Sequence, residues 1–476
     1  GLKSIGSTAF AGCTALPSFD IPGQVETVGS EAFVVCTSLA RVTVPDSVTS
    51  LGSGVFADCS SLADITLGCG LARIENGRFP TTIASGETLT VVGSGSTVIA
   101  DSAFKGCTMR KLVLKGVSAI EGPSNSSLSW GAFRGCPNLV TVECDGALAA
   151  LGISAFRECT ALTTFTGATG LKTIGDMAFA GCTSLPSFDI PAQVETVGHA
   201  AFYNCTSLAQ VRIPDSVTSL GADVFAGCGA LAEVTLGCGL ARIENGRFPA
   251  TIASNATLTV EGSGSTVIAD SAFRGCTMRK LVLKGVSSIE GPSNRDLSWG
   301  AFRGCPNIEE VETDECLKDI GISAFRENPK LVSFSGATAV TNIHDAAFAG
   351  CTSLAAAPLP ETLEAIGIAA FYGCSSIRSV EIPDATAAIG REAFWSCTSL
   401  TNLTLGSGWR RVEAERFPSD AEGLDTVTVR GTGDVVVALS AFQNFKMRHV
   451  KLEGVSTVDG PAFSSNREGA FRNCPN

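Results

Sequence analysis

Apolar and polar residues alternate over short stretches of the chain, and a Pro or Gly ends each stretch. The segment 39–45 (LARVTVP) places Leu, Val and Val at positions 39, 42 and 44, and the segments 16–22 and 62–68 repeat this spacing. Alternation with a period of two predicts a strand that is buried on one face. A shorter alternation follows in DSVTSLG (46–52), so each unit is expected to hold two short strands.

A Phe and a Cys follow the second predicted strand. They stand three residues apart in AFVVC (32–36) and again in VFADC (55–59). Residues three apart lie on one face of a helical turn. The sequence therefore predicts a short helical turn that directs both side chains into a core.

This Phe recurs along the whole chain. It stands at residues 10, 33, 56, 79, 104, 133 and 156, and the same intervals start again at 179 and at 348. One block is therefore 169 residues long, and LGCGLARIENGRFP appears unchanged at 67–80 and 236–249. Recurrence at a short fixed period predicts a solenoid. We expect one continuous solenoid of about 20 coils over 1–476, built from super-repeats 1–169, 170–338 and an incomplete 339–476.

Composition argues against several classes of function. Acidic residues outnumber basic ones by 46 to 34, giving a net charge of −12, which argues against nucleic acid or an anionic membrane surface as the main partner. Three histidines leave little room for acid–base chemistry or a His-rich metal site. No apolar run is long enough to span a bilayer. We expect no enzyme activity, no metal and no cofactor.

The repeated unit resembles a known family. VPDSVTSLGSGVFADCSSLADITL (44–67) and its counterparts resemble the BspA-like, or Treponema pallidum-type, leucine-rich repeats. The resemblance covers nearly the whole chain and implies a β-rich, right-handed solenoid with parallel strands. It also implies non-enzymatic surface proteins, several of them adhesins that bind host or matrix proteins. No binding residue is implied, because the family's motif is its core.

Fifteen of the nineteen cysteines occupy the position three residues after the recurrent Phe. We interpret them as a ladder of small buried side chains, because free Cys is among the most buried residue types. The same position holds Asn328 and Phe445 in two other units, which neither a disulfide nor a thiolate cluster would tolerate. Cys69, Cys238 and Cys316 lie off the ladder, so disulfides there stay open.

Insertions in the sixth unit of each complete block are the first candidate contact site. They read GPSNSSLSW (122–130) and GPSNRDLSW (291–299), and each ends in a Trp, Trp130 or Trp299. Long loops on a repeat scaffold tend to line its binding face. Alternatively, each Trp covers the gap that the insertion leaves.

A recurrent basic segment, TMRKLVLKG (108–116 and 277–285), is the second candidate. Its cations could dock acidic partners or neighbouring copies of the chain, or they are ordinary solvated charges. The residues concerned are Arg110 and Lys111 with Arg279 and Lys280.

Sequons at Asn125 and Asn255 lie in loop-like stretches and are candidate glycosylation sites if the source is a eukaryotic secretory pathway.

Two functions remain open. The chain is expected to be an extracellular or cell-surface scaffold that binds other proteins or glycans, or else a structural subunit that assembles with further copies of itself into a filament, wall or appendage. Both ends stop within the repeat pattern. Because solenoids ordinarily need polar caps, we expect a fragment of a longer chain or ends covered by neighbouring subunits.

Overall fold

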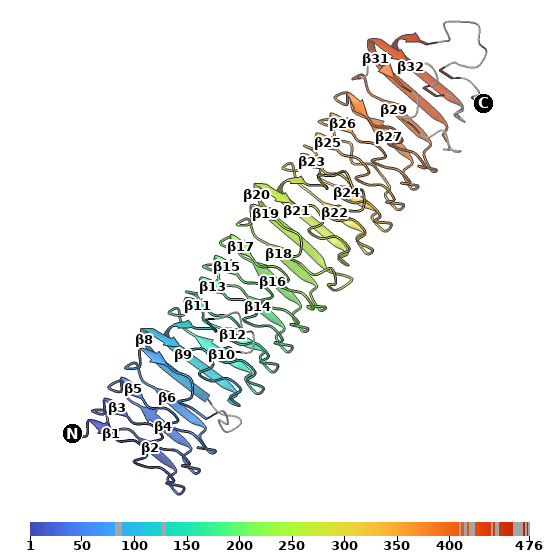
Figure 1. The fold of residues 1–476 in the computed structure, drawn as a ribbon. Coiled ribbons are helices and arrows are strands. Elements are labelled where there is room, and N and C mark those ends of the chain that lie inside the picture. Colours follow the sequence, from blue (N-terminus) through green and yellow to red (C-terminus); the bar gives the residue numbers. More distant parts are fainter. Residues whose placement is uncertain are drawn as a thin grey trace. The chain divides into compact units, whose positions relative to one another are not determined.

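The computed structural model describes residues 1–80, 88–124, 130–408, 411–413, 417, 424–438, 441–442, 447–459, 470–471 and 474. The chain forms two compact units. The first comprises Gly1–Leu231 with Arg247–Pro249, and the second comprises Ala232–Gly246 with Ala250–Asn476. Within each unit, short parallel strands follow one another coil after coil (Figure 1). The β-rich, parallel-strand solenoid is therefore confirmed, while its continuity over the whole chain stays a prediction.

The described residues of the first unit form seventeen strands, nearly all of two to four residues. They are β1 (Ser4–Ile5), β2 (Ser18–Asp20), β3 (Thr27–Val28), β4 (Arg41–Val44), β5 (Ser50–Leu51), β6 (Asp64–Leu67), β7 (Arg73–Ile74), β8 (Thr88–Ile99), β9 (Lys111–Ile120), β10 (Thr141–Cys144), β11 (Ala150–Leu151), β12 (Thr164–Thr166), β13 (Thr173–Ile174), β14 (Ser187–Asp189), β15 (Thr196–Val197), β16 (Gln210–Ile213) and β17 (Ser219–Leu220).

The second unit continues the same pattern. Its strands are β18 (Glu233–Leu236), β19 (Arg242–Ile243), β20 (Thr257–Ile268), β21 (Lys280–Ile289), β22 (Glu310–Glu312), β23 (Asp319–Ile320), β24 (Ser333–Ser335), β25 (Asn342–Ile343), β26 (Ala365–Ile366), β27 (Ser379–Ile382), β28 (Ala388–Ile389), β29 (Asn402–Leu405), β30 (Arg411–Val412), β31 (Thr426–Val437) and β32 (His449–Val458).

Neighbouring coils pair in parallel and in the register of the sequence repeat. Val42 of β4 lies opposite Ile65 of β6, and both side chains are buried. One sheet of the first unit has the order β17-β15-β13-β11-β9-β8-β6-β4-β2. The long strands β8 and β9 run through both strand positions of a coil, because β9 pairs with β10 at one end and with β11 at the other. Each coil therefore repeats two strand positions, as predicted.

The recurrent Phe rings form the core. Phe33 and Phe56 have no exposed surface, and their ring centroids lie 5.5 Å apart with a 19° angle between the rings. In the second unit, Phe348 and Phe371 stack at 5.2 Å and 2°. One coil cannot bury such a ring alone, so each coil completes the core of its neighbour. The predicted inward Phe spine is confirmed.

The predicted short helical turn is wrong, since the described residues contain no helix. Two i+3 hydrogen bonds close the turn, from the Tyr203 amide to the Ala200 carbonyl and from the Cys205 amide to the Phe202 carbonyl. The Phe202 amide instead donates to Val224 of the next coil. Ala200 and Asn204 have φ angles of 51° and 57°, a left-handed conformation that breaks a right-handed helix. Every second amide of the turn therefore donates a hydrogen bond to the neighbouring coil.

The cysteine ladder is buried as predicted, and it also donates hydrogen bonds. The Cys205 thiol, which has no exposed surface, donates to the Phe179 carbonyl of the preceding coil over 3.2 Å. Where Asn328 replaces the Cys, its Nδ2 donates to the equivalent Phe302 carbonyl over 3.0 Å. No disulfide joins any of the nineteen cysteines, which all lie within the described residues, and Cys13 is exposed. The ladder thus satisfies one buried carbonyl per coil.

Candidate functional site

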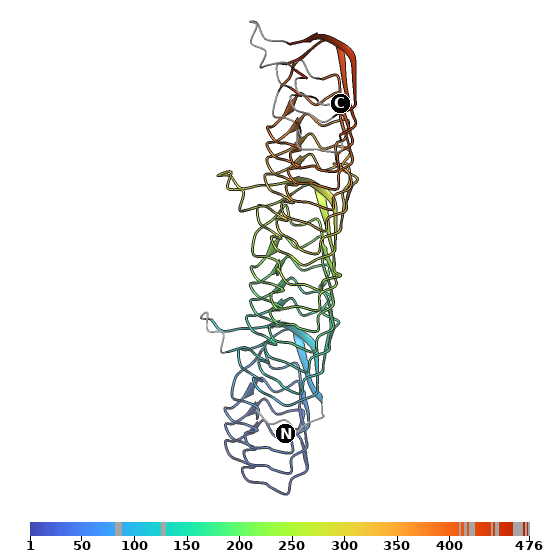
Figure 2. The ribbon, with the colours of Figure 1, turned by 90° about the vertical axis from the view of Figure 1, so that its right-hand side faces the viewer.

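The insertion in the second unit, 291–299, projects from the side of its coil (Figure 2). We call this segment and its counterpart at 122–130 the tryptophan loops. Trp299 is 41% exposed and Leu297 is 37% exposed, although most large apolar side chains of the unit are buried. The tip of this loop therefore offers two adjacent apolar side chains to solvent.

Hydrogen bonds within the loop fix its shape. One carboxylate oxygen of Asp296 accepts the Ser298 amide over 2.8 Å, and the other accepts the Trp299 indole N–H over 3.2 Å. Asn294 Oδ1 accepts the Asp296 amide over 3.0 Å. The bonds to Ser298 lower the pKa of the Asp296 carboxyl, so it stays ionised at neutral pH. The loop holds its conformation largely through its own polar groups.

Three arginines of successive coils contact the loop and hold it in place. Arg274, Arg303 and Arg326, which we call the arginine row, each follow the recurrent Phe directly. The Arg274 guanidinium carbon lies 4.7 Å from the centre of the Trp299 ring, a cation–π contact. Arg303 donates to the Ser298 carbonyl over 2.7 Å, and Arg326 donates to the Leu297 carbonyl over 3.0 Å.

Glu327 holds the arginine row in place. Its carboxylate lies 2.6 Å from Arg303 and 3.4 Å from Arg326. Because both cations are bonded to an acid and to a loop carbonyl, their positions are fixed on both sides. The exposed indole is therefore presented on a rigid support.

The first copy repeats the support of the Trp, while residues 125–129 of its loop lie outside the described residues. Lys105, Arg134 and Arg157 occupy the positions of the arginine row, and Lys105 Nζ lies 4.6 Å from the centre of the Trp130 ring, which is 44% exposed. Glu158 lies 2.8 Å from Arg134 and 3.4 Å from Arg157. Sequence reasoning missed this support. A basic residue after the Phe in three successive coils was the signal that could have revealed it.

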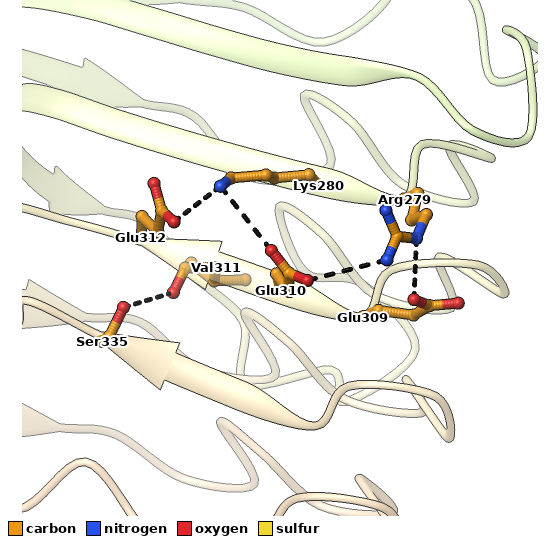
Figure 3. A network of polar contacts seen from close by, with 7 residues as sticks. All are labelled: Arg279, Lys280, Glu309, Glu310, Val311, Glu312 and Ser335. Atoms are coloured by element: carbon orange, nitrogen blue, oxygen red, sulfur yellow. Dashed lines mark hydrogen bonds and ion pairs between the residues drawn. The ribbon is translucent and has the colours of Figure 1, made fainter.

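The recurrent basic segment behaves differently in the two copies. In the second copy, Arg279 lies 2.8 Å from Glu309 and 3.7 Å from Glu310, and Lys280 lies 2.6 Å from Glu312 and 3.6 Å from Glu310 (Figure 3). The hydrogen bond to Glu312 raises the pKa of Lys280. The acids of the next coil thus neutralise this predicted contact site.

In the first copy, Lys111 lies 2.8 Å from Glu143. Arg110 is exposed and has no ion pair with any described residue. The two copies therefore carry the same cations at these positions but differ in the number of acids that pair with them.

The candidate glycosylation sites fall in different parts of the structure. Asn255 is exposed in a turn before β20. Asn125 lies outside the described residues. Glycosylation at both stays a prediction.

No catalytic constellation is found in the described part of the chain. No group of three or more His, Cys, Asp or Glu residues there could hold a metal ion. His344 Nε2 lies 3.9 Å from a single carboxylate, Asp319, and both side chains are about half exposed. A hollow of about 440 Å³ in the first unit is lined by 165–169, Asp189 and 191–193, and Asp189 is its only charged residue. No described helix is long and apolar enough to cross a membrane.

The sequence matches a family model described as BspA type leucine rich repeat region. The matches cover residues 1–121, 126–254, 257–367 and 341–474. A comparison with curated proteins found no match.

Solved leucine-rich repeat proteins are similar to this chain. One from Bacteroides ovatus is 21% identical, with 84% of this chain and 82% of that chain covered and a TM-score of 0.38. A leucine-rich cell surface protein from Faecalibacterium prausnitzii is 24% identical, with 85% and 83% covered and a TM-score of 0.27. The T. pallidum leucine-rich repeat protein is 21% identical, with 52% and 83% covered and a TM-score of 0.28.

Proposed function

The chain belongs to the BspA-type leucine-rich repeat family, and on that premise we propose that it is a non-enzymatic, extracellular or cell-surface scaffold that binds a partner protein through its two tryptophan loops. The coil stack supplies a rigid support, and the loops supply the contact. The surface location follows from family membership and is part of the proposal.

The single observation that supports this function most strongly is the exposed, pre-organised Trp. Buried hot spots of protein interfaces are enriched in Trp and Arg, and a rigid anchor loses little conformational entropy on binding. Trp299 lies on Arg274 and donates to Asp296, and the exposed Leu297 stands two residues before it in the loop. Trp130 on Lys105 offers the same contact a second time.

The second candidate function is a structural subunit of a filament, wall or appendage. The near-identical 169-residue blocks favour it, because they repeat the same surface at a regular interval along the sequence. In that case the partner of a tryptophan loop is another copy of the chain. The binding function is placed first because two loops with a shared support are a specific contact feature.

A binding array tests the proposal. The purified protein is applied to arrayed extracellular proteins and arrayed glycans, and hits are measured by biolayer interferometry. We expect a protein partner whose affinity falls by about 30-fold or more in the Trp130→Ala/Trp299→Ala variant, the loss typical of hot-spot residues. The matched control is Tyr203→Ala/Tyr372→Ala, which removes two aromatics that are 42% exposed but lie outside the loops; its affinity should change by less than about threefold.

Three results would contradict the proposal. They are binding that does not depend on either Trp, binding to glycans alone, and binding only to further copies of the chain. The last result would favour the structural subunit.

A further inference from the structure

The two complete blocks differ in charge around one strand face. In the first copy, neutral residues on β8, at the start of β10 and directly before β10 occupy positions where the second copy has acids: Val92, Thr141 and Val140 correspond to Glu261, Glu310 and Glu309. The cations of the segment are the same in both copies: Arg110, Lys111 and Lys115 correspond to Arg279, Lys280 and Lys284. Acids therefore surround these cations in one block and are replaced by neutral residues in the other.

In the second copy every cation of the segment lies beside an acid. Arg279 and Lys280 make the four ion pairs of Figure 3. Lys284 is the register partner of Glu261 on the adjacent strand. Lys284 is exposed and makes no ion pair with a described residue, but an acid stands opposite it, so two of the three cations on this surface are neutralised and the third faces an acid.

The first copy leaves two cations open. Lys115 is exposed, its register partner is Val92, and it makes no ion pair with a described residue. Arg110 is exposed and has no described ion-pair partner either, while Lys111 is paired with Glu143. In the sequence, Glu87 corresponds to Ala256 and is one acid that only the first copy carries, but it lies outside the described residues. Counted in the sequence, the first copy has two acids around these cations and the second has four. They are Glu87 and Glu143 in the first copy, and Glu261, Glu309, Glu310 and Glu312 in the second.

We propose that Arg110, Lys111 and Lys115, which we call the cationic face, dock an extended acidic segment of a partner protein. Arg110 and Lys115 are without an ion pair to any described residue, and Lys111 between them already contacts Glu143. Lys111, Val113 and Lys115 alternate along β9 with the same outward orientation, because their neighbours Leu112 and Leu114 are buried. Four residues of strand span about 13 Å. An extended partner with acids four residues apart and an apolar residue midway matches this pattern.

The apolar residues favour a peptide over a sulfated polysaccharide. Val113 lies between the two lysines, and Val92 lies opposite Lys115. An acidic peptide can place an apolar side chain there, whereas a sulfated sugar chain presents polar groups along its length. Charge complementarity would set the specificity and association rate of such a contact, so binding should weaken as salt rises.

An exchange of residues between the two copies tests the proposal. The closed variant, Val92→Glu/Val140→Glu/Thr141→Glu, gives the first copy the acids of the second. The opened variant, Glu261→Val/Glu309→Val/Glu310→Thr, does the reverse. Each change installs a residue that the chain already carries at the equivalent position, so the fold should tolerate it. The probe is an immobilised peptide that repeats Glu-Thr-Val-Thr, with a Gln-Thr-Val-Thr repeat as the uncharged control and heparin as the sulfated one.

We expect the wild type to bind the acidic peptide at low salt, the closed variant to bind about tenfold more weakly, and the opened variant to bind more tightly. Equal binding by wild type and closed variant would overturn the proposal, as would no gain in the opened variant or binding to heparin alone. If the closed variant fails to fold by circular dichroism, Lys115→Gln gives the same test. Binding should survive Trp130→Ala/Trp299→Ala, which separates this surface from the tryptophan loops.

Discussion

Replacing Phe202 by alanine is expected to lower the free energy of unfolding of the first unit by about 3–5 kcal/mol, the usual cost of removing a buried aromatic ring. Phe202 has no exposed surface and stacks on Phe179 at 5.3 Å and on Phe225 at 5.6 Å. Because each coil depends on its neighbours for burial, the cavity weakens the contacts on both sides of it. Chemical denaturation followed by circular dichroism measures the loss.

The adjacent residue is the matched control. Tyr203 is 42% exposed, so Tyr203→Ala should change the free energy of unfolding by less than about 1 kcal/mol. Similar losses in both variants would mean that the Phe rings are not the continuous core of the unit.

Alkaline pH is expected to unfold the protein, and the midpoint of this unfolding transition should lie at about pH 10. Burial raises the pKa of the Cys59 thiol to about 11 and that of Cys107 to about 12, and it raises that of Cys182 well above the ordinary value. A thiol whose pKa is raised by folding stabilises the fold below its unfolded pKa, and this stabilisation is lost as pH rises toward the folded value. The loss therefore falls between about pH 8.5, the unfolded thiol pKa, and about pH 12.

The effect is large because many coils contribute. Within that window, each buried thiol lowers the free energy of unfolding by about 1.4 kcal/mol per pH unit. Four buried thiols of the first unit would together lower the free energy of unfolding by about 6 kcal/mol per pH unit, which is comparable with the whole stability of a typical domain. They are Cys107, Cys136, Cys182 and Cys205.

A pH titration in reducing buffer measures this loss. Circular dichroism and most of the thiolate absorbance should change together, because the buried thiols ionise only when the coils open, whereas exposed thiols such as Cys13 do not depend on opening. The variant Cys205→Asn, which installs the side chain that Asn328 already provides at the equivalent position, should make the transition less steep by about one proton. Ionisation of most of the thiols near pH 8.5 in a folded protein, or an intact fold at about pH 11, would contradict the buried ladder.

The sequence predicted the core because the core repeats. Phe33, Cys36 and Val42 recur in fixed phase, and a residue that recurs in every coil has to occupy the same place in every coil. The strand alternation was equally informative, since Val42 and Val44 are buried while Thr43 between them is exposed. These are local patterns with a period that one sequence reveals.

The missed features depend on contacts between coils. Phe and Cys three residues apart fit a helical turn, but the backbone amides of that turn bond to the next coil, which local spacing does not reveal. The thiol ladder fits an apolar core, and its role as a donor required the position of the Phe179 carbonyl. Arg326 of the arginine row and the acids around Lys280 likewise lie about one coil away from the residues that they hold.

The most direct test of the central claim, that a single chain is the working binding scaffold, is the particle mass and appearance of the purified protein over a wide range of concentrations. Light scattering and electron microscopy measure both. The account predicts discrete particles with the mass of one chain at every concentration. Ordered fibres that lengthen with concentration and show a regular axial repeat would contradict it and would make the protein a structural subunit.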